Sequence, residues 1–476
     1  MKKRFCAVLI VLLACALCAA LCACNKDDGA SAVYLVFDGD IAGGAVSLNL
    51  QNYPKEPYSY DDDGETVNTE GWNLTALLQD VEMLCADNRL MITSAADGVS
   101  AMIEANLTGT IFVYQNDEGK LCTKGVDYPR AVGIKDISEI TVVSKTPQDV
   151  DSGIKILTVQ KTEVIGFGAA KMKLFRLSVE NTMGNNKAYK YLPADDRTVS
   201  SFTGRENNAA YFCDFDIQMS TDNKTLSWRQ GNLYLDNKAV FGFATNAQRS
   251  VMDAYNAIKA YIDSGEKVMF ILPDGFSWQQ ATEFEDDLDA LKASRAEGYA
   301  VSTHPAISPV ALASIVTGET PYATGIHFDE GESRAVLKPN APDIFEYAVS
   351  QGKSVGYLEG SGNLIITSTE PVYGLNDNQT YENAKTAIAA GKDLIFVHFQ
   401  EIDDQNHGYG ALSEQSKAKC IVIDSYIADL RAQFDGIIII VPDHGHVTLS
   451  DSNNNAYGKH GMFTNLDMYV PFFVYE

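Results

Sequence analysis

The chain has 476 residues, of which 46% are hydrophobic and 21% are charged, and this balance excludes a wholly disordered protein. Its 37 basic and 63 acidic residues give a formal charge of −26, which argues against nucleic-acid binding through a basic surface. At about 150 residues per domain, the length predicts two to four domains. All seven histidines lie after residue 303, so histidine chemistry is expected only in the last third of the chain.

The first segment has the features of an export signal. Three basic residues at positions 2–4 precede an uncharged apolar run over residues 5–23, and a polar stretch follows. The sequence Leu-Cys-Ala-Cys at 21–24 resembles a bacterial lipobox, which implies a signal peptide over residues 1–23 and a lipid-modified Cys24. An uncleaved membrane anchor is the alternative, because the run is near the length of a spanning helix. Both interpretations place the rest of the chain outside the cell, attached to the membrane.

Four cysteines lie beyond this segment, and none of them has the CxxC spacing of a zinc finger or a redox motif. They are Cys85, Cys122, Cys213 and Cys420. A disulfide between the first two and a pair of buried free thiols are equally open interpretations.

Residues 32–147 are predicted to form a β-rich accessory domain, because short apolar stretches are separated by Asp, Gly and Asn turns. The succession of GWNLTALLQDV, ITSAADGVSAMI and VGIKDISEITVVS resembles the molybdopterin-binding domain of sulfite-oxidase-like proteins. The cysteine that ligates molybdenum in that family has no counterpart here, so we favour an accessory or binding module. Residues 148–264 are predicted to form a second β-rich region that ends in a helix at about 247–263.

From residue 265 onward, the continuous apolar runs KVMFILPDG, DLIFVHFQ and GIIIIVPDH alternate with amphipathic segments. The segments lie near residues 279–297, 341–351, 381–391 and 411–433. This alternation predicts an α/β domain over 265–476, with a mostly parallel sheet covered by helices on both faces. We expect the domain to fold alone from about residue 247, and ligands to bind beyond the carboxyl ends of its strands.

Acidic and imidazole side chains follow these apolar runs. They are Asp274, Asp403, His407, Asp443, His444 and, later in the chain, His460. Carboxylates and imidazoles suit Zn²⁺, with Mn²⁺ as the alternative, and six such ligands with one hydroxyl are enough for two ions. Helix caps and turns are the ordinary roles of single residues of this kind. Their joint placement at successive strand ends favours a metal centre.

Ser308 begins the apolar segment SPVALASIVTG. A Ser-Pro pair at this place is typical of a helix N-cap followed by proline at the first helical position. The same place suits a nucleophile, because the helix dipole and a nearby metal would both favour the alkoxide. The two interpretations are compatible.

Taken together, Asp274, a hydroxyl residue six positions before SIVTG, Asp-x-x-x-His, Asp-His and a final His resemble the alkaline phosphatase superfamily. The branch is that of the type I phosphodiesterases and nucleotide pyrophosphatases, and the resemblance covers about 266–476. It implies an alkaline-phosphatase-like fold, two divalent ions and Ser308 as the nucleophile. One ion would be held by Asp274, Ser308, Asp443 and His444, and the other by Asp403, His407 and His460.

The resemblance implies a hydrolase of small-molecule phosphoric esters, either monoesters or diesters, that acts outside the cell. The alternative is a surface-anchored binding lipoprotein whose hydrolase domain is vestigial. Metal content separates the two, because about two bound ions per chain favour the enzyme.

The remaining histidines are expected outside the ligand set. His398 lies inside a buried run and is predicted to be a core residue, whereas His304 and His327 are expected in loops near Ser308. His446 is expected to support the ligands. Asp404 is a rival of its neighbour for the metal, but the residue four positions before His407 is Asp403, which fits the family pattern.

Overall fold

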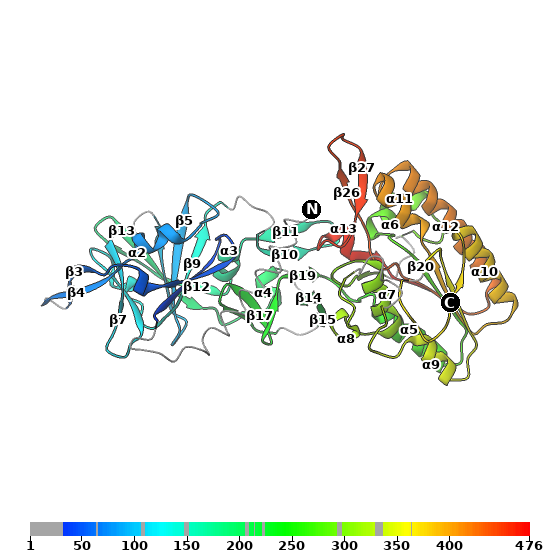
Figure 1. Ribbon diagram of the computed structural model, residues 1–476, viewed down its shortest axis with the longest axis horizontal. Helices are drawn as coiled ribbons and strands as arrows, with labels where there is room; N and C mark the ends of the chain where they lie inside the picture. The colour runs from blue at the N-terminus through cyan, green and yellow to red at the C-terminus, as the bar shows by residue number, and fades with distance from the viewer. Residues whose placement is uncertain are drawn as a thin grey trace. The chain divides into compact units, whose positions relative to one another are not determined.

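The computed structural model describes residues 32–62, 65–105, 110–146, 152–204, 209–213, 215–220, 224–292, 298–328, 337–362 and 364–476 (Figure 1). The expected signal peptide and Cys24 lie outside these residues. The chain divides into two compact units. Unit 1 comprises Met1–Ile154, Val164–Arg197 and Leu226–Tyr234, and unit 2 comprises Lys155–Glu163, Thr198–Thr225 and Leu235–Glu476. Within the described ranges, no helix has the length and apolarity needed to cross a membrane.

Unit 1 is built mainly from two β-sheets. The first has the order β12 (Phe175–Met183), β13 (Asn186–Pro193), β6 (Ser100–Glu104), β5 (Asn88–Ser94), β9 (Ile137–Ser144), β1 (Tyr34–Gly39) and β2 (Ala45–Asn49). The second has the order β3 (Glu56–Asp62), β4 (Glu65–Asn73), β7 (Ile111–Gln115) and β8 (Leu121–Gly125). The other elements are α2 (Leu74–Leu77), α3 (Phe167–Met172), η1 (Leu50–Asn52), η2 (Leu78–Asp80), η4 (Arg130–Val132), β16 (Leu226–Arg229) and most of β17 (Asn232–Leu235).

The core of unit 1 follows from the period-two pattern of its strands. Leu35 and Phe37 of β1 are buried, and they belong to one apolar cluster with Ile140 of β9 and with Trp72 and Val113 of the second sheet. The β-rich texture expected before residue 147 is therefore present in the structure.

Unit 2 is organised around a six-stranded sheet. Its order is β23 (Val372–Tyr373), β22 (Val355–Glu359), β24 (Leu394–Phe399), β20 (Val268–Pro273), β25 (Ile437–Ile440) and β29 (Phe473–Tyr475). The strands pair in parallel except for β29, which runs antiparallel to β25 at the edge.

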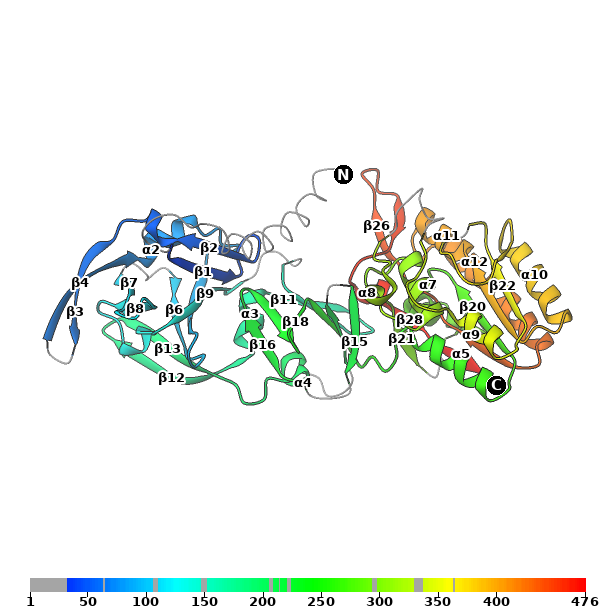
Figure 2. The same cartoon turned by 60° about the horizontal axis from the view of Figure 1, so that its bottom comes forward.

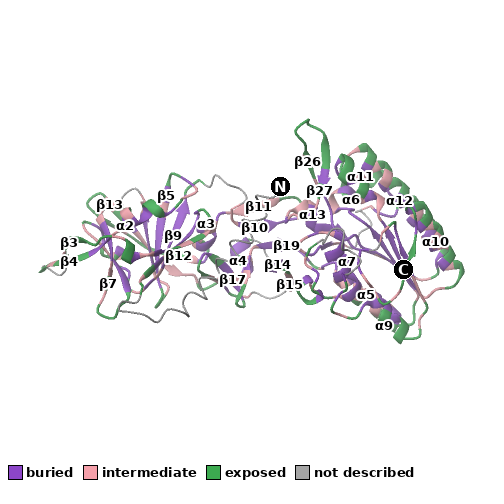
Figure 3. Ribbon diagram, viewed as in Figure 1, coloured by how far each residue is buried: buried purple, intermediate pink, exposed green. Residues whose placement is uncertain are grey.

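Helices cover both faces of this sheet, so its apolar strands are buried on both sides (Figure 3). Along β20, Val268 and Phe270 pack with α5 (Asp253–Asp263), α7 (Ser308–Thr317) and α9 (Ile344–Ser350). The alternate residue Met269 packs with α6 (Trp278–Glu283), α10 (Asp377–Ala389), α11 (Glu401–Tyr409) and α12 (Glu414–Gln433). Figure 2 shows α5 and α9 on the opposite side of the strands from α10 and α12.

Unit 2 also contains most of a five-stranded sheet that precedes the α/β part in sequence. Its order is β11 (Thr162–Ile165), β10 (Ile154–Leu157), β19 (Gly242–Thr245), β14 (Ala209–Cys213) and β15 (Asp216–Ser220). The remaining elements of the unit are α4 (Val199–Thr203), β18 (Lys238–Val240), η5 (Glu285–Asp287), β21 (Tyr299–Val301), α8 (Pro321–Thr324), β26 (Val447–Ser450), β27 (Ala456–Lys459), α13 (Asn465–Met468) and β28 (Tyr469–Pro471).

These early strands share a core with the C-terminal segment of the chain. Phe212 and Ala244 are buried in the same cluster as Phe463 and Tyr469. The Tyr469 hydroxyl donates hydrogen bonds to the carbonyl oxygens of Leu157 (3.2 Å) and Thr245 (3.0 Å). Strands that precede residue 247 therefore belong to the core of unit 2, and the expectation that the domain folds alone from about residue 247 stays a prediction. Residues 148–264, predicted to be one accessory region, are divided between the two units.

The four cysteines beyond the signal segment are all buried, and Cys85, Cys122 and Cys420 are free thiols. Cys85 and Cys122 are therefore thiols in this structure, and the disulfide interpretation does not hold.

Candidate functional site

The site lies where three neighbouring parallel strands end. Asp274 directly follows β20, and Asp443 follows β25 by three residues. On the other side of β20, β24 is followed by α11, which carries Asp403. Because the carboxyl ends of parallel strands meet at one edge of a sheet, these three carboxylates converge there.

Ser308 contacts two of the expected ligands. Its Oγ lies 3.1 Å from Nε2 of His444 and 3.5 Å from Oδ1 of Asp274. The same Nε2 of His444 lies 3.6 Å from Oδ1 of Asp274 and 3.4 Å from Oδ2 of Asp443. All four residues are buried. The hydroxyl, the imidazole and both carboxylates therefore face one small volume.

Ser308 is the first residue of α7 and not its N-cap. The N-cap is Ile307, with extended backbone and no side-chain hydrogen bond to the helix, and Pro309 follows in the first turn. The capping role expected for Ser308 is therefore wrong, and its hydroxyl is directed at His444 instead. Its place at the N-terminus of α7 does agree with the nucleophile interpretation, since the helix dipole favours negative charge there.

A second group of side chains forms beside the first. Asp403 and His407 lie one turn apart on α11, so both project from the same face of the helix. Nε2 of His407 is 3.4 Å from Oδ2 of Asp403 and 3.1 Å from Nε2 of His460. His460 follows β27 and is oriented by its Nδ1, which lies 3.1 Å from the carbonyl oxygen of Ala306. Three of the predicted ligands thus meet here.

The side chains form two groups with the spacing of metal ligands, and Asp403 is common to both. One group is Asp274, Asp403 and His444, and the other is Asp403, His407, His446 and His460. Asp443 adjoins the first group through its contact with His444. All seven residues predicted from the sequence therefore come together. His446, predicted only to support the ligands, lies among them with Nε2 3.1 Å from Oδ1 of Asp403.

The charges in the site favour a bound cation. Burial, together with the neighbouring carboxylates of Asp443 and Asp403, raises the pKa of Asp274 well above its usual range. Burial also raises the pKa of Asp443. Oδ2 of Asp443 is buried without a hydrogen-bond partner. Carboxylates crowded together in an apolar setting are stabilised by divalent ions, so the donor set fits a metal centre.

The histidines are set up as neutral ligands. Burial is the largest cause that lowers the pKa of His444 to about 3, and burial also lowers the pKa of His460 to about 3. Burial opposes the ionisation of Asp403, but His446, His444 and His407 outweigh it and hold its pKa well below the usual range. Neutral imidazole and ionised carboxylate are the forms that bind metal.

His398 is buried in the core as predicted, but it also supports the site. Its Nε2 lies 3.0 Å from Oδ2 of Asp274, and its Nδ1 is in contact with Oε1 of Glu359. Glu359 is fully buried and accepts hydrogen bonds from the Tyr357 hydroxyl and from Nε2 of Gln400 (3.0 Å). The two carboxylates outweigh the effect of burial and raise the pKa of His398 well above its usual range.

A hollow of about 460 Å³ opens onto these residues. Ser308, Asp403 and His407 line it together with Asp404, whose pKa is raised by burial and by its acidic neighbours. Volumes of this order hold small-molecule ligands. The site is thus open to solvent on the side of His407, whose side chain is 46% exposed.

Two other histidines lie outside the site. His304 packs against Phe241 and Phe463, with ring centroids 5.1 and 5.4 Å away. His327 stacks on Phe215 at 4.5 Å. Both histidines therefore contribute to packing, His304 in the segment before α7 and His327 in the segment after it.

No curated protein matches the sequence of this chain. Among solved structures, a match is to an inactive variant of murine ectonucleotide pyrophosphatase/phosphodiesterase 5 in complex with AMP, at 16% identity and a TM-score of 0.31. That match covers 40% of this chain and 59% of that one. Residues 363–468 match the family described as type I phosphodiesterase/nucleotide pyrophosphatase. The chain is therefore similar to this family over residues 363–468.

Proposed function

We propose that unit 2 is a metal-dependent hydrolase of phosphoric esters with Ser308 as its nucleophile. The observation that carries this proposal is the position of Oγ of Ser308, 3.1 Å from His444 and 3.5 Å from Asp274, on a hollow rimmed by further ligands. A hydroxyl that only capped a helix would have no reason to face an imidazole and a carboxylate.

Two divalent ions fit the donor set, with Zn²⁺ preferred and Mn²⁺ as the alternative. Asp274, Ser308, Asp443 and His444 would hold one ion, and Asp403, His407 and His460 the other. When bound, such ions act as Lewis acids and neutralise charge on the phosphoryl oxygens and on the nucleophile. Asp403 is in both spatial groups, which supports a pair of ions sharing one carboxylate neighbour.

The residues of the chain would position the phosphoric ester and stabilise the negative charge that develops on its phosphoryl group. Ser308 would attack phosphorus, the bond to the leaving oxygen would break, and a phosphoserine would form. Attack by water would then release phosphate or a phosphomonoester and regenerate the hydroxyl. Ser308 and Pro309 form the N-terminus of α7 and line the hollow. The helix dipole and the free backbone N–H groups of a helix N-terminus favour a negative phosphoryl group at such a place.

The test is a substrate screen on the purified chain with p-nitrophenyl phosphate and bis-p-nitrophenyl phosphate. We expect hydrolysis of at least one ester, loss of activity after chelation and recovery after addition of Zn²⁺ or Mn²⁺. About two ions per chain should be present in the active protein. A protein that binds no metal and hydrolyses neither ester would contradict the proposal.

We further propose that the enzyme works outside the cell, attached to the membrane by lipid on Cys24. The support is the sequence of residues 1–24 alone. In a bacterial host, Cys24→Ser should release the chain from the membrane fraction and abolish labelling by a fatty acid. Retention of both would exclude the lipid anchor.

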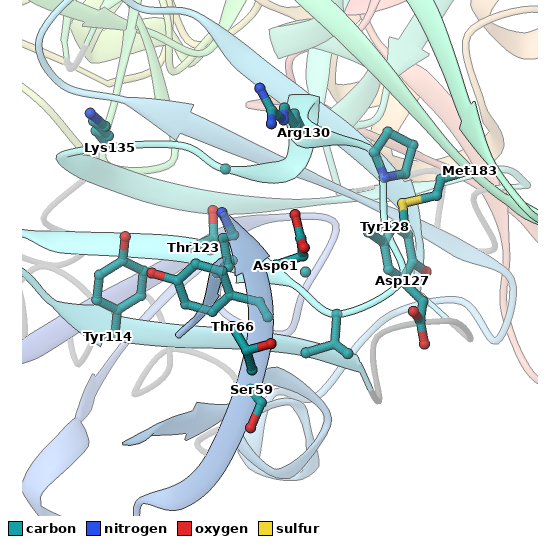
Figure 4. A pocket seen from close by; sticks show the side chains of 16 residues that line it. Ser59, Asp61, Thr66, Tyr114, Thr123, Asp127, Tyr128, Arg130, Lys135 and Met183 are labelled. Carbon is teal, nitrogen blue, oxygen red and sulfur yellow. The ribbon is translucent and has the colours of Figure 1, made fainter. Parts of the chain in front are cut away.

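A second function is favoured by a hollow of about 510 Å³ in unit 1 (Figure 4). Its lining includes three tyrosines and three cations, which are Tyr60, Tyr114, Tyr128, Lys124, Arg130 and Lys135. The acidic side chains of the lining are Asp61 and Asp127, so the hollow carries a small positive excess on a chain with a formal charge of −26. Nζ of Lys124 lies 4.1 Å from the centre of the Tyr60 ring.

We propose that this hollow binds an acidic oligosaccharide. Tyrosine rings offer flat apolar faces for the C–H faces of sugars, and Arg and Lys bind carboxylate groups. Calorimetry on the full chain should detect binding of oligogalacturonate but not of a neutral oligosaccharide of equal length. Tyr114→Ala and Arg130→Ala should each weaken binding at least tenfold, whereas Lys187→Ala, a change of an exposed lysine outside the hollow, should not. Equal affinity for the neutral sugar, or no binding of either, would exclude this function.

A further inference from the structure

Helix α11, which carries Asp403 and His407, begins without a cap of its own. Its N-cap residue is Gln400, whose side chain makes no hydrogen bond to the helix. Instead, Nε2 of Gln400 donates to Oε1 of Glu359 (3.0 Å), and Oε1 of Gln400 accepts from the backbone N–H of Ser361 (3.0 Å). The N–H groups that have no partner within the first turn of a helix therefore need another acceptor here.

A carboxylate from another helix supplies this acceptor. Oδ1 of Asp377 accepts from the backbone N–H of Gln400 (2.8 Å), and Oδ2 accepts from the backbone N–H of Glu401 (3.0 Å). Asp377 is the first residue of α10 and is 1% exposed. We infer that Asp377 is a positioning residue, which holds the start of α11 and through it the ligands Asp403 and His407. This inference rests on the proposed two-ion site.

Asp377 is available to α11 because its own helix is capped by the preceding residue. The N-cap of α10 is Asn376, whose Oδ1 accepts from the backbone N–H of Gln379 (2.9 Å). Two neighbouring side chains thus serve the first turns of two different helices, Asn376 that of α10 and Asp377 that of α11.

The carboxyl group of Asp377 is ionised at neutral pH. Burial is the largest influence on it and raises its pKa to about 6, although the N–H groups of Gln400 and Glu401 act in the opposite direction. Both oxygens are therefore free of a proton and can accept. The group lies at the N-termini of α10 and α11, where the helix dipoles favour a negative charge.

The end of α11 that Asp377 holds is the end that carries a metal ligand in its first turn. Glu401, which donates its N–H to Asp377, is two residues before Asp403. Further along the helix, Nδ2 of Asn406 donates to the carbonyl oxygen of Gly275 (2.9 Å). These contacts hold α11 on either side of Asp403. Asp377 itself belongs to neither ligand group, so it acts on the ions through the helix.

The first test is titration of the full chain with Zn²⁺ at neutral pH in competition with a chromophoric chelator. Asp377→Ala should lower the affinity for the ion of Asp403, His407 and His460 by about 10–100-fold, as is typical when a supporting contact of a metal site is lost. Asp377→Asn keeps one oxygen that can accept an N–H, so its loss of affinity should be smaller. Asn376→Ala is the matched control, because it removes a cap from α10 alone and should leave the affinity for both ions unchanged.

Two results of this titration would overturn the inference. Equal losses of affinity in Asp377→Ala and Asn376→Ala would show that the effect comes from α10. Unchanged affinity in Asp377→Ala would show that the ligands on α11 need no acceptor from outside the helix. If Asp377→Ala does not fold, Asp377→Asn carries the same comparison with Asn376→Ala.

Amide hydrogen exchange in metal-free protein, followed by mass spectrometry, separates this inference from the proposed function. Both Asp377 variants should speed exchange at Gln400 and Glu401 by about tenfold or more, because these amides lose their acceptor. Asn376→Ala should instead speed exchange at Gln379. Unchanged exchange at the start of α11 in both Asp377 variants would reject the inference. Absence of metal from the unmodified chain would reject the proposed function, while exchange would still decide whether Asp377 holds α11.

Discussion

The two halves of the site differ in their access to water. Around Ser308, the side chains of Asp274, Asp443 and His444 are 5% exposed or less. Around Asp403, the side chain of His407 is 46% exposed. The buried half contains the candidate nucleophile, and residues of both halves line the hollow. The exposed side chain of His407 makes the open half the more accessible of the two to water.

The carboxylates of the two halves are held in opposite ways. Burial raises the pKa of Asp274 and of Asp443, whereas the neighbouring histidines keep the pKa of Asp403 low. A cation is thus most needed in the buried half, where it compensates charge that water cannot reach. The open half is already partly compensated by imidazoles. We expect an ion to be held more tightly in the buried half and to exchange faster in the open half.

The largest effect is expected from Ser308→Ala in the buried half. Turnover of p-nitrophenyl esters should fall by several powers of ten, because the group that bonds to phosphorus is lost. The melting temperature should change little, since the Ser308 side chain does not cap α7. Steady-state kinetics and thermal unfolding on the same samples measure both quantities.

Two further variants act as controls for this prediction. Ser308→Thr retains a hydroxyl and should keep measurable activity. Ser308→Cys should keep less, because a thiolate is a poor match for phosphorus and for hard metal ions. Near-normal turnover in Ser308→Ala would remove Ser308 as the nucleophile.

The sequence predicted which side chains converge, because most of the candidate ligands follow an apolar run and the ends of such runs meet in a parallel sheet. It also located α7 and the strand that Asp274 follows. His446 was expected only to support the ligands, but it lies in one group with Asp403, His407 and His460, and no pattern in the sequence indicates this. His398 gave a signal that could have been used: it is the single ionisable residue in the strand LIFVHF.

The extent of unit 2 could not be predicted from its own α/β pattern. The strands that contain Phe212 and Ala244 read as part of an accessory region, but they bury Phe463 and Tyr469 near the C-terminus. Contacts between segments more than 200 residues apart leave no periodic trace in the sequence.

The next largest effect concerns metal in the open half. His407→Ala and His460→Ala should each lower the content from about two ions to about one, because each removes a ligand of the same site. In the unmodified chain, a chelator should remove one ion much faster than the other. Elemental analysis over a time course of chelation measures this. Equal rates of loss for both ions would contradict the proposed difference between the halves.

A smaller effect is expected at His398, which contacts the buried half from behind. His398→Leu should retain about two ions but lower the affinity for the more tightly bound ion by about 10–100-fold, because Asp274 loses the donor that orients it. His398→Gln keeps an N–H near the position of Nε2 and should recover part of this affinity. Competition with a chelator during metal titration measures the change.

Phe396→Leu is the matched control for His398. Phe396 is buried two residues earlier on β24, and its side chain therefore lies on the same face of the strand. This substitution should lower the free energy of unfolding by about 1–3 kcal/mol and leave metal affinity unchanged. Equal loss of metal affinity in Phe396→Leu and His398→Leu would reduce His398 to a packing residue.

The smallest effect concerns the stability of the fold in acid, which must be known before loss of metal in acid can be interpreted. His304 is buried between aromatic rings, and burial, aided by the charge of Lys155, lowers its pKa to about 4. The unfolded chain, with a histidine pKa of about 6.5, takes up this proton first. Stability is therefore complete above about pH 6.5 and falls as the pH approaches 4, by at most about 3 kcal/mol. In metal-free protein, denaturant unfolding between pH 7 and pH 4.5 should show this decline, and His304→Leu should make it shallower. If the two profiles are parallel, His304 does not set acid stability. If the decline is shallower in the variant, His304→Leu stays folded at a lower pH than the unmodified chain. Metal release from the two halves of the site can then be compared at that pH without unfolding.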